Sequence, residues 1–342
     1  MSINQNKLTT NVKTNPQHGV QPFTDAVENL GIDNNITGNS WFAVGNFDCD
    51  GHKLSYMFHV SVLRMSKVLP IRMINTVFSL TDSTTGWYQS KDQFFTAGKG
   101  TEIATEGLHI KFKDGLMSGD LDDLHIRANA DFGAIDLHLT AIGFPLYNAG
   151  TGYFKIFSVA NYQYSIPTLK TTGTIKIEEK TYQVTGNSWF DRQYANPDKK
   201  SSGNLKDGYP CHWAWMNLSF KENDDQLSLW GAMDNKTTEE YAWATILHAD
   251  GSQEVVEVSP LSNAGTKPFD STKTGNHYPT HWQIKIPAKN ASLTIVAGPA
   301  NQEIIAGDKN GNKYEGASSI TGTYDQQSVT GDCFVELVGP WL

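Results

Sequence analysis

Hydrophobic and polar residues alternate with a period of two along much of the first half of the chain. Every second residue from 54 to 62 is apolar, namely Leu54, Tyr56, Phe58, Val60 and Val62. The same alternation recurs at residues 108–112, 124–132 and 135–141. Because successive side chains of a β-strand point to opposite faces, this period is typical of half-buried antiparallel strands. The pattern therefore predicts a first half made mostly of antiparallel sheet.

The second half of the chain repeats this pattern. Its candidate strands are residues 174–178, 213–220, 226–233, 241–247, 282–286, 292–296 and 334–338. Residues 213–220 are apolar on both faces, which predicts a strand buried on both sides. Glycine accepts the positive φ of tight turns, so hairpin turns are predicted at Asp50-Gly51, Asp114-Gly115 and Asp250-Gly251. A short helix is predicted at residues 23–30, and residues 63–77 are ambiguous.

The length of the chain predicts two domains. It has 342 residues, against ~100–200 residues in a typical domain. A junction is predicted at residues 162–167, because Pro167 cannot donate a hydrogen bond to a strand ladder. The pentapeptide Gly-Asn-Ser-Trp-Phe occurs at 38–42 and again at 186–190, which two related β-domains would explain. We therefore predict an all-β fold with an N-terminal tail at 1–35 and two β-domains at 36–167 and 168–342.

Charge and cysteine content narrow the class of function. The net charge is −9 and no run of Lys or Arg forms a basic stripe, so neither nucleic acid nor an anionic membrane surface is an expected partner. No stretch of 18 apolar residues occurs, and the polar first 19 residues lack the apolar core of a signal peptide. Cys49, Cys211 and Cys333 lie far apart and predict no disulfide framework. A soluble, cytoplasmic protein is expected.

The aromatic content points to the type of ligand. Aromatic residues make up 11% of the chain, and nine of them are tryptophan. A barrel of roughly eight strands can hold one small ligand, and aromatic walls favour an apolar one. Neither a phosphate-binding glycine loop nor a convincing metal-ligand spacing is present, so no cofactor and no metal are expected. The expected partner is a small lipophilic substrate.

The stretch of residues 186–194 concentrates candidate chemistry. Period-two geometry places Trp189 and Asp191 on one face of a strand, and Arg192 and Tyr194 on the other. A carboxyl group beside aromatic side chains is costly to bury unless it is paired or protonated, and a protonated one can act as an acid. Asp191 is therefore either half of a surface pair with Arg192 or a buried proton donor.

The remaining candidates each have an ordinary structural explanation beside the functional one. His59 lies on the polar face of its strand, where it is either solvated or a site residue. Glu315 either pairs at a turn or lies in a cleft. Trp213 and Trp215 share a face and are either plain core or a ligand wall. The candidate substrate-binding residues are Tyr56, His59, Tyr164, Trp189, Arg192, Trp213 and Trp215.

Ordered blocks of sequence resemble a known family. The segment YSIPTLKTTGTIKIEEKTYQVTGNSWFDRQY resembles the central signature of the carotenoid 1,2-hydratase (hydroxyneurosporene synthase) and kievitone hydratase-like family. HWAWMNLSF, LSLWGAMD, YPTHWQIKIP and YEGASSITGTYDQQSVTGDCFVEL follow in the family's order, and NSWFAVGNFDCDG resembles its opening strand. The resemblance covers residues from about 160 to 339. It implies two lipocalin-like antiparallel β-barrel domains packed together, with a cavity for a lipophilic ligand at or between them.

The resemblance also implies a type of reaction. Members of the family add water to a double bond, and the family includes decalin-forming Diels-Alderases. By this resemblance Asp191 protonates the alkene and Tyr194 stabilises the cation, although the family usually has Trp at that position, which is the better cation partner. Glu315 is a candidate for positioning water. Three hypotheses follow: a cofactor-independent hydratase-like lyase, a pericyclase or isomerase, and a non-catalytic carrier of a hydrophobic ligand.

Overall fold

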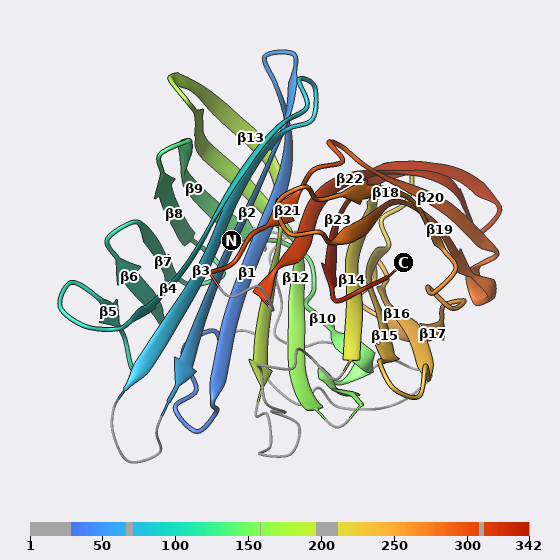
Figure 1. Ribbon diagram of the computed structural model, residues 1–342, viewed down its shortest axis with the longest axis horizontal. Helices are drawn as coiled ribbons and strands as arrows, with labels where there is room; N and C mark the ends of the chain where they lie inside the picture. Colours follow the sequence, from blue (N-terminus) through green and yellow to red (C-terminus); the bar gives the residue numbers. More distant parts are fainter. Residues whose placement is uncertain (1–28, 66–70, 158, 196–210, 308–310, 342) are drawn as a thin grey trace, which may run out of the picture.

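The computed structural model describes residues 29–65, 71–157, 159–195, 211–307 and 311–341. Its strands form two antiparallel sheets (Figure 1), and the predicted all-β fold is confirmed. The helical segments in this part of the chain are short 3₁₀ turns, Asn148–Gly150 and Pro287–Lys289. Among the described residues no helix has the length and apolar character to cross a membrane. The helix predicted at residues 23–30 lies almost wholly outside the described residues.

The first sheet contains every strand up to residue 195. In chain order its strands are β1 (Gly38–Cys49), β2 (His52–Arg64), β3 (Arg72–Asp82), β4 (Trp87–Thr96), β5 (Glu102–Ile103), β6 (Leu108–Phe112), β7 (Gly115–Gly119), β8 (Leu124–Ala130), β9 (Gly133–Ala141), β10 (Leu146–Tyr147), β11 (Tyr153–Ile156), β12 (Val159–Ile177) and β13 (Lys180–Ala195). They are paired in the order β4-β3-β2-β1-β13-β12-β9-β8-β7-β6-β5, with β10 and β11 added against β12.

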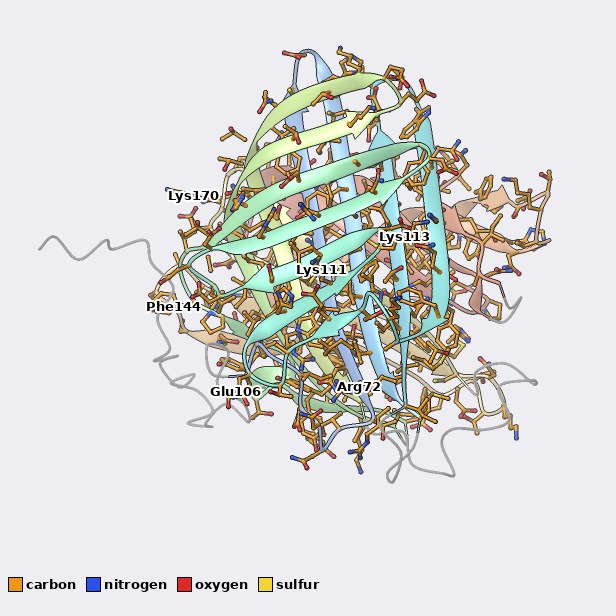
Figure 2. All side chains as sticks on the ribbon, turned by 90° about the vertical axis from the view of Figure 1, so that its left-hand side faces the viewer. Arg72, Glu106, Lys111, Lys113, Phe144 and Lys170 are labelled. Atoms are coloured by element: carbon orange, nitrogen blue, oxygen red, sulfur yellow. The ribbon has the colours of Figure 1, made fainter. Side chains whose placement is uncertain are left out.

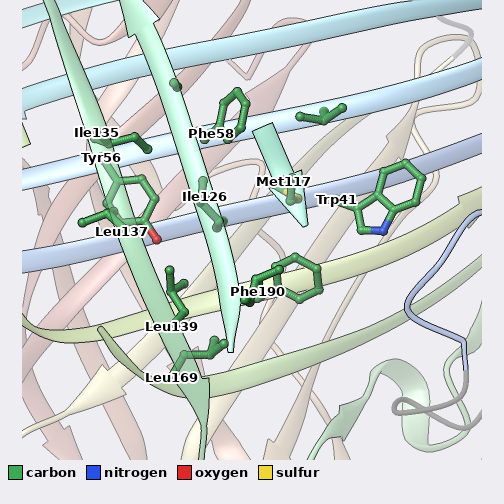
Figure 3. Close-up of a cluster of buried hydrophobic side chains, with 14 of the residues drawn as sticks. Trp41, Tyr56, Phe58, Met117, Ile126, Ile135, Leu137, Leu139, Leu169 and Phe190 are labelled. Carbon is green, nitrogen blue, oxygen red and sulfur yellow. The ribbon is translucent and has the colours of Figure 1, made fainter. Parts of the chain in front are cut away.

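This sheet curls around its own hydrophobic core. Figure 2 shows its green strands, which include β8 and β9, crossing in front of the blue strands β1 and β2. The side chains between them include Trp41, Phe58, Ile126, Leu137 and Phe190, all of which are buried (Figure 3). Strands β4 and β6 approach each other through their rings, with Phe95 and Phe112 5.6 Å apart. The curl gives the barrel-like unit that the resemblance implied.

The second sheet follows the same plan. Its strands are β14 (Cys211–Phe220), β15 (Gln226–Asp234), β16 (Glu240–Leu247), β17 (Gln253–Glu257), β18 (Gly265–Asp270), β19 (His277–Ile286), β20 (Ala291–Ala297), β21 (Glu303–Ile304), β22 (Lys313–Tyr324) and β23 (Gln327–Val338). The pairing order is β17-β16-β15-β14-β23-β22-β20-β19-β18. Strands β14, β23, β22 and β20 therefore neighbour one another as β1, β13, β12 and β9 do in the first sheet.

A third hydrophobic cluster joins the two sheets, and we call it the inter-sheet layer. Alternate side chains of a strand point to opposite faces, so the central strands contribute to two cores at once. From the first sheet, Phe42 and Trp189 face outward into this layer, and from the second sheet Trp215 and Phe334 meet them. The Phe42 ring lies 5.5 Å from that of Trp215. Strand β14 is thus buried on both faces, as its apolar sequence predicted.

The division between the sheets differs from the predicted division at residue 167. Strand β12 runs through Pro167 with a register shift between Ile166 and Leu169, so the proline is accommodated by a β-bulge and does not end the strand. The alternating segment 174–184 holds the tight turn between β12 and β13, where Glu178 has a φ of 52°. Since β13 still belongs to the first sheet, we propose that the boundary between the two units lies between β13 and β14.

The repeated pentapeptide does not mark equivalent places in the two sheets. Its copies lie on β1 and β13, which are hydrogen-bonded neighbours in the first sheet, with Phe42 opposite Asp191. The likeness between the two halves of the chain lies in their strand order. The interpretation of the pentapeptide as the trace of one copy per domain was therefore wrong.

Close approach of β9 and β12 generates a stability prediction. Gly173 has a φ of +145°, and an added Cβ would lie 2.1 Å from the carbonyl oxygen of Asp136. We expect Gly173→Ala to lower the free energy of unfolding by about 2–4 kcal/mol in urea denaturation. Gly98→Ala is the control, because the nearest atom to its added Cβ is 3.9 Å away. Equal stability of the two variants would contradict this close approach.

Candidate active site between the two sheets

Asp191 lies in the inter-sheet layer as a buried carboxyl group. Its residue is 4% exposed, and its Oδ1 accepts a hydrogen bond of 2.7 Å from Trp189 Nε1 on the same face of β13. Burial raises the pKa of Asp191 to about 7, against the opposing hydrogen bonds from Ser165, Trp189 and Gln163, and Glu336 adds to the increase. The carboxyl group therefore carries a proton through the acidic range and close to neutrality.

Arg192 points to the opposite face of β13, into the first core. Its guanidinium lies over the rings of Trp41 and Tyr194, at 4.2 Å and 3.8 Å from the ring centroids. It donates hydrogen bonds to three backbone carbonyls and to the side-chain oxygen of Asn39. Because Arg192 is fully buried there, the alternative of a surface pair between Asp191 and Arg192 was wrong. The carboxyl group is free to be neutral.

Three predicted tyrosines also belong to the first core. Tyr56 donates a hydrogen bond of 3.0 Å to Ser188 Oγ, and the hydroxyls of Tyr164 and Tyr194 both donate to the carbonyl of Asn29. Since Tyr194 follows Asp191 by three residues on a strand, the two side chains point to opposite faces. The structure does not bring Tyr194 to the Asp191 carboxyl group, and tryptophans line the face that Asp191 occupies.

The predicted tryptophans lie in the same layer as Asp191. The rings of Trp189 and Trp215 are 6.2 Å apart, edge to face. Trp213, on the same face of β14, donates a 2.7 Å hydrogen bond from Nε1 to Glu336 Oε1. Sequence reasoning missed Trp230 in this layer; its partner Trp243 stacks on it at 6.3 Å. The period-two positions of β15 and β16 carried the signal that could have found both.

Two carboxyl groups and a lysine of the second sheet lie on the strand faces that form the inter-sheet layer. Glu315 on β22 is fully buried, and it lies directly opposite Glu336 on β23. Lys313 Nζ is 2.6 Å from Glu315 Oε1. Burial raises the pKa of Glu315 well above its usual range; Lys313 opposes this increase and Glu336 reinforces it. The candidate Glu315 is thus neither solvated nor at a surface turn.

His59 enters the same layer from β2. Its Nε2 lies 2.6 Å from Ser40 Oγ and 3.1 Å from Ser61 Oγ. Burial, with a smaller contribution from Lys313, lowers the pKa of His59 well below its usual range, so its ring is neutral. The other ring nitrogen, Nδ1, is buried without a hydrogen-bond partner. Of the two ring nitrogens of the predicted residue His59, only Nε2 therefore has a hydrogen-bond partner.

Several buried polar atoms of the inter-sheet layer have no hydrogen-bond partner within the described part of the protein. They include His59 Nδ1, Gln163 Oε1 and Trp230 Nε1. Such an atom costs about 1–3 kcal/mol, and its retention calls for a specific explanation such as function or bound water. His59, Trp213 and Glu336 also keep part of their surface accessible, whereas Phe42 and Phe334 beside them are buried. The layer therefore combines sealed apolar contacts with polar groups that keep some accessible surface.

A cleft of about 360 Å³ opens at the rim between the two sheets. It is lined by Tyr88, Gln89, Ser90, Phe269, Ser271, Thr272, Lys273, Asn301, Glu303 and Ile305. The Tyr88 hydroxyl is buried at its inner end, within electrostatic reach of Glu315. The cleft lies between the two units, but its lining is more polar than the sequence predicted for a lipophilic ligand.

One further cluster was not predicted from the sequence. His125, Asp136 and His138 place their ligand atoms within 4.8 Å of one another on the outer face of β8 and β9. The hairpin register sets His125 directly opposite His138, and that register could have revealed the pair. The cluster lies on a solvent-facing surface of the first sheet, apart from Asp191.

Comparisons with known proteins agree with the resemblance described above. A family model described as AttH-like matches residues 28–340. Dehydratase asqC of Emericella nidulans is 23% identical over 262 residues, 72% of this chain and 72% of that protein. Kievitone hydratase of Fusarium solani subsp. phaseoli is 26% identical over 259 residues, 72% of this chain and 69% of that protein. The crystal structure of kievitone hydratase from Nectria haematococca has a TM-score of 0.78 at 20% identity, over 98% of this chain and 97% of that chain. The predicted family and fold are thereby confirmed.

The raised pKa of Asp191 generates a prediction for stability. An acid with a higher pKa in the folded state stabilises the fold below its unfolded pKa of 3.8 and loses that contribution as the pH rises toward about 7. The unsubstituted protein loses this contribution as the pH rises, and Asp191→Asn does not. We therefore expect the free energy of unfolding of the variant, minus that of the unsubstituted protein, to increase by about 4 kcal/mol between about pH 4 and pH 7. Urea denaturation of both proteins across this range measures it. If the difference in free energy of unfolding between the two proteins does not change with pH, Asp191 is an ordinary, ionised aspartate.

Proposed function

The chain belongs to the AttH-like family, and on that premise we propose that it is a cofactor-independent lyase of the hydratase type. Its substrate is a lipophilic terpenoid, prenylated or polyene compound, and the reaction adds water to a carbon–carbon double bond or removes it. The names of the relatives kievitone hydratase and dehydratase asqC describe these two directions. By microscopic reversibility, the forward and reverse directions of one such reaction pass through the same steps.

The observation that carries the proposal is a buried carboxyl group with a raised pKa beside indole rings, with the neighbouring guanidinium turned to the opposite face. Protonation of an alkene requires an acid that stays neutral until it transfers its proton, and a carboxyl group with a raised pKa meets that need. Asp191 has its pKa raised to about 7, and Arg192 is held in the first core. Asp191 is accordingly the proposed general acid.

The proposed reaction proceeds in two steps. Asp191 transfers its proton to one carbon of the double bond, which forms a C–H bond and leaves a cation on the other carbon. The electron-rich faces of Trp189 and Trp215 shield that cation. A water molecule then forms the C–O bond and releases one proton, so that alkene and water give an alcohol. Glu315 is the proposed group that positions this water.

Two rival functions make different demands on the same site. A pericyclase needs a shaped cavity that folds a polyene into a reactive conformer and needs no acid. A non-catalytic carrier needs neither an acid nor a cavity that folds its ligand into a reactive conformer. The burial of a carboxyl group without a cationic partner costs stability, and neither rival function requires that cost. This is why we place the hydratase-type reaction first.

Asp191→Asn tests the proposal. The purified protein is incubated with prenylated flavonoids, terpenoids and polyenes, and mass spectrometry detects a gain or loss of one water. We expect the variant to lose at least about 10²–10⁴-fold in turnover, while quenching of tryptophan fluorescence reports unchanged binding. Asp136→Asn, at an exposed aspartate of β9, is the matched control and retains turnover.

The other outcomes identify the rivals. A product of unchanged mass that still forms in Asp191→Asn would identify a pericyclase or isomerase. Stoichiometric binding with complete recovery of every compound would identify a carrier. Either result would overturn the assignment of Asp191 as the acid.

A further inference from the structure

Two histidines lie side by side on the outer face of the first sheet. His125 on β8 and His138 on β9 are direct register partners in this antiparallel hairpin, and side chains at such positions have Cβ atoms about 4.5–5.5 Å apart. Their imidazole rings are stacked, with centroids 4.4 Å apart and an interplanar angle of 9°. Figure 2 views the molecule from the side on which β8 and β9 cross in front of the blue strands. The register of the hairpin thus brings two nitrogen ligands together.

The first core holds this register in place. Ile126 follows His125 on β8 and Leu137 precedes His138 on β9, and both apolar side chains are buried in the first core. A slip of one residue between the strands would turn one of these apolar sets toward solvent. Both histidines therefore stay on the outer face, opposite each other.

A carboxyl group adds a third ligand. Asp136 lies two residues before His138, on the same face of β9, and its Oδ1 is 2.8 Å from His125 Nε2. One ligand atom from each of the three residues lies within 4.8 Å of the other two. Ligand atoms held about 2.0–2.1 Å from a tetrahedral Zn²⁺ ion are about 3.3 Å apart. Because all three side chains are partly or largely exposed, rotation about their side-chain bonds can close that difference.

A second carboxylate orients one of the two imidazoles. His138 Nδ1 is 2.8 Å from Asp123 Oδ1. Because a carboxylate oxygen accepts hydrogen bonds, Nδ1 is the donor, and the lone pair of the neutral ring is then on Nε2. Metal-binding histidines usually donate their other ring N–H to a carboxylate or carbonyl in this way. Asp123 is thus suited to be a positioning residue for a metal ligand.

An ordinary surface pair looks different. On β6 of the same sheet, His109 Nε2 is 3.1 Å from Glu102 Oε2, which is a single imidazole beside a single carboxylate. Within the described residues His109 belongs to no group of three such ligand atoms. The second imidazole is what distinguishes His125 and His138 from this pair.

We propose that His125, Asp136 and His138 bind a divalent transition-metal ion of the Zn²⁺ type on the outer face of the first sheet. Two imidazole nitrogens and one carboxylate oxygen suit Zn²⁺, Ni²⁺ and Cu²⁺, whereas Ca²⁺ and Mg²⁺ prefer oxygen ligands. Arg127, opposite Asp136 in the register, places one opposing positive charge on the same face. The ion links β8 to β9, and the proposed hydratase chemistry does not use it.

Titration with Zn²⁺ alone tests the site. The full chain without an affinity tag is stripped with a chelator and titrated by calorimetry at pH 7.5. We expect Zn²⁺ to bind and excess Ca²⁺ not to displace it. His125→Ala and His138→Ala each lose this binding, while His109→Ala is the matched control and keeps it. In protein labelled with ¹⁵N-histidine, Zn²⁺ shifts the ring nitrogen resonances of His125 and His138 and leaves those of His109 unchanged.

Variants of Asp123 test its positioning role. We expect Asp123→Ala to weaken Zn²⁺ binding by about 10–100-fold and to reduce the Nδ1–H tautomer of His138, which the ¹⁵N resonances report. Asp123→Asn can still accept the hydrogen bond from Nδ1, so it retains the tautomer and more of the affinity. Unchanged affinity and tautomer in Asp123→Ala would overturn this role.

Three results would overturn the metal site itself. The first is the absence of Zn²⁺ binding by the parent protein. The second is binding that persists unchanged in His125→Ala or His138→Ala, since the ion would then lie elsewhere. The third is displacement of Zn²⁺ by Ca²⁺, which would indicate carboxylate ligands alone. Both histidines are partly or largely exposed, so the variants are expected to fold; His125→Gln and His138→Gln replace any alanine variant that does not.

Discussion

The inter-sheet layer depends on central strands that serve two cores at once. In β13, Phe190 fills the first barrel while its neighbours Trp189 and Asp191 face the second sheet. The same division holds in β14, where Met216 packs into the second core and Trp215 into the layer. Two curled sheets that pack back to back leave few routes for water between them. Polar groups on those outward faces, such as Asp191 and Glu315, are therefore taken out of solvent by the packing of the sheets.

Desolvation then decides the chemistry of the groups in this layer. It raises the pKa values of Asp191 and Glu315 and lowers that of His59, so each of the three is driven toward its neutral form. Lys313, which contacts Glu315, opposes the increase in the pKa of Glu315. A layer built in this way stores protons near neutral pH, where an exposed carboxylate would have released them. Arg192 does not disturb this arrangement because its guanidinium lies in the first core, where it donates hydrogen bonds to backbone carbonyls.

The shared strand order of the two sheets has a further consequence. Each unit alone would expose one aromatic face, with Phe42 and Trp189 on the first and Trp215 and Phe334 on the second. Covering these faces with each other stabilises both units and at the same time buries Asp191 of one sheet in the same layer as Glu315 of the other. Stability and the candidate chemistry therefore rest on the same contact, and loss of packing in this layer affects both.

The sequence by itself determined the all-β fold, most strands of the second half, the family and the alternation that separates Asp191 from Arg192, because these follow from local period-two geometry and from ordered blocks of sequence. It could not determine which side of β13 meets the second sheet, since both faces of that strand are buried and both carry aromatic rings. The sequence did not reveal that the first sheet ends after β13, because the alternation of hydrophobic and polar residues continues through the turn at Glu178. The pairing of Glu315 with Glu336 depends on strand register, and their position in the same layer as Asp191 depends on the packing of two sheets whose strands lie far apart in the chain. Only the tertiary structure decided these contacts, because no local pattern of residues encodes them.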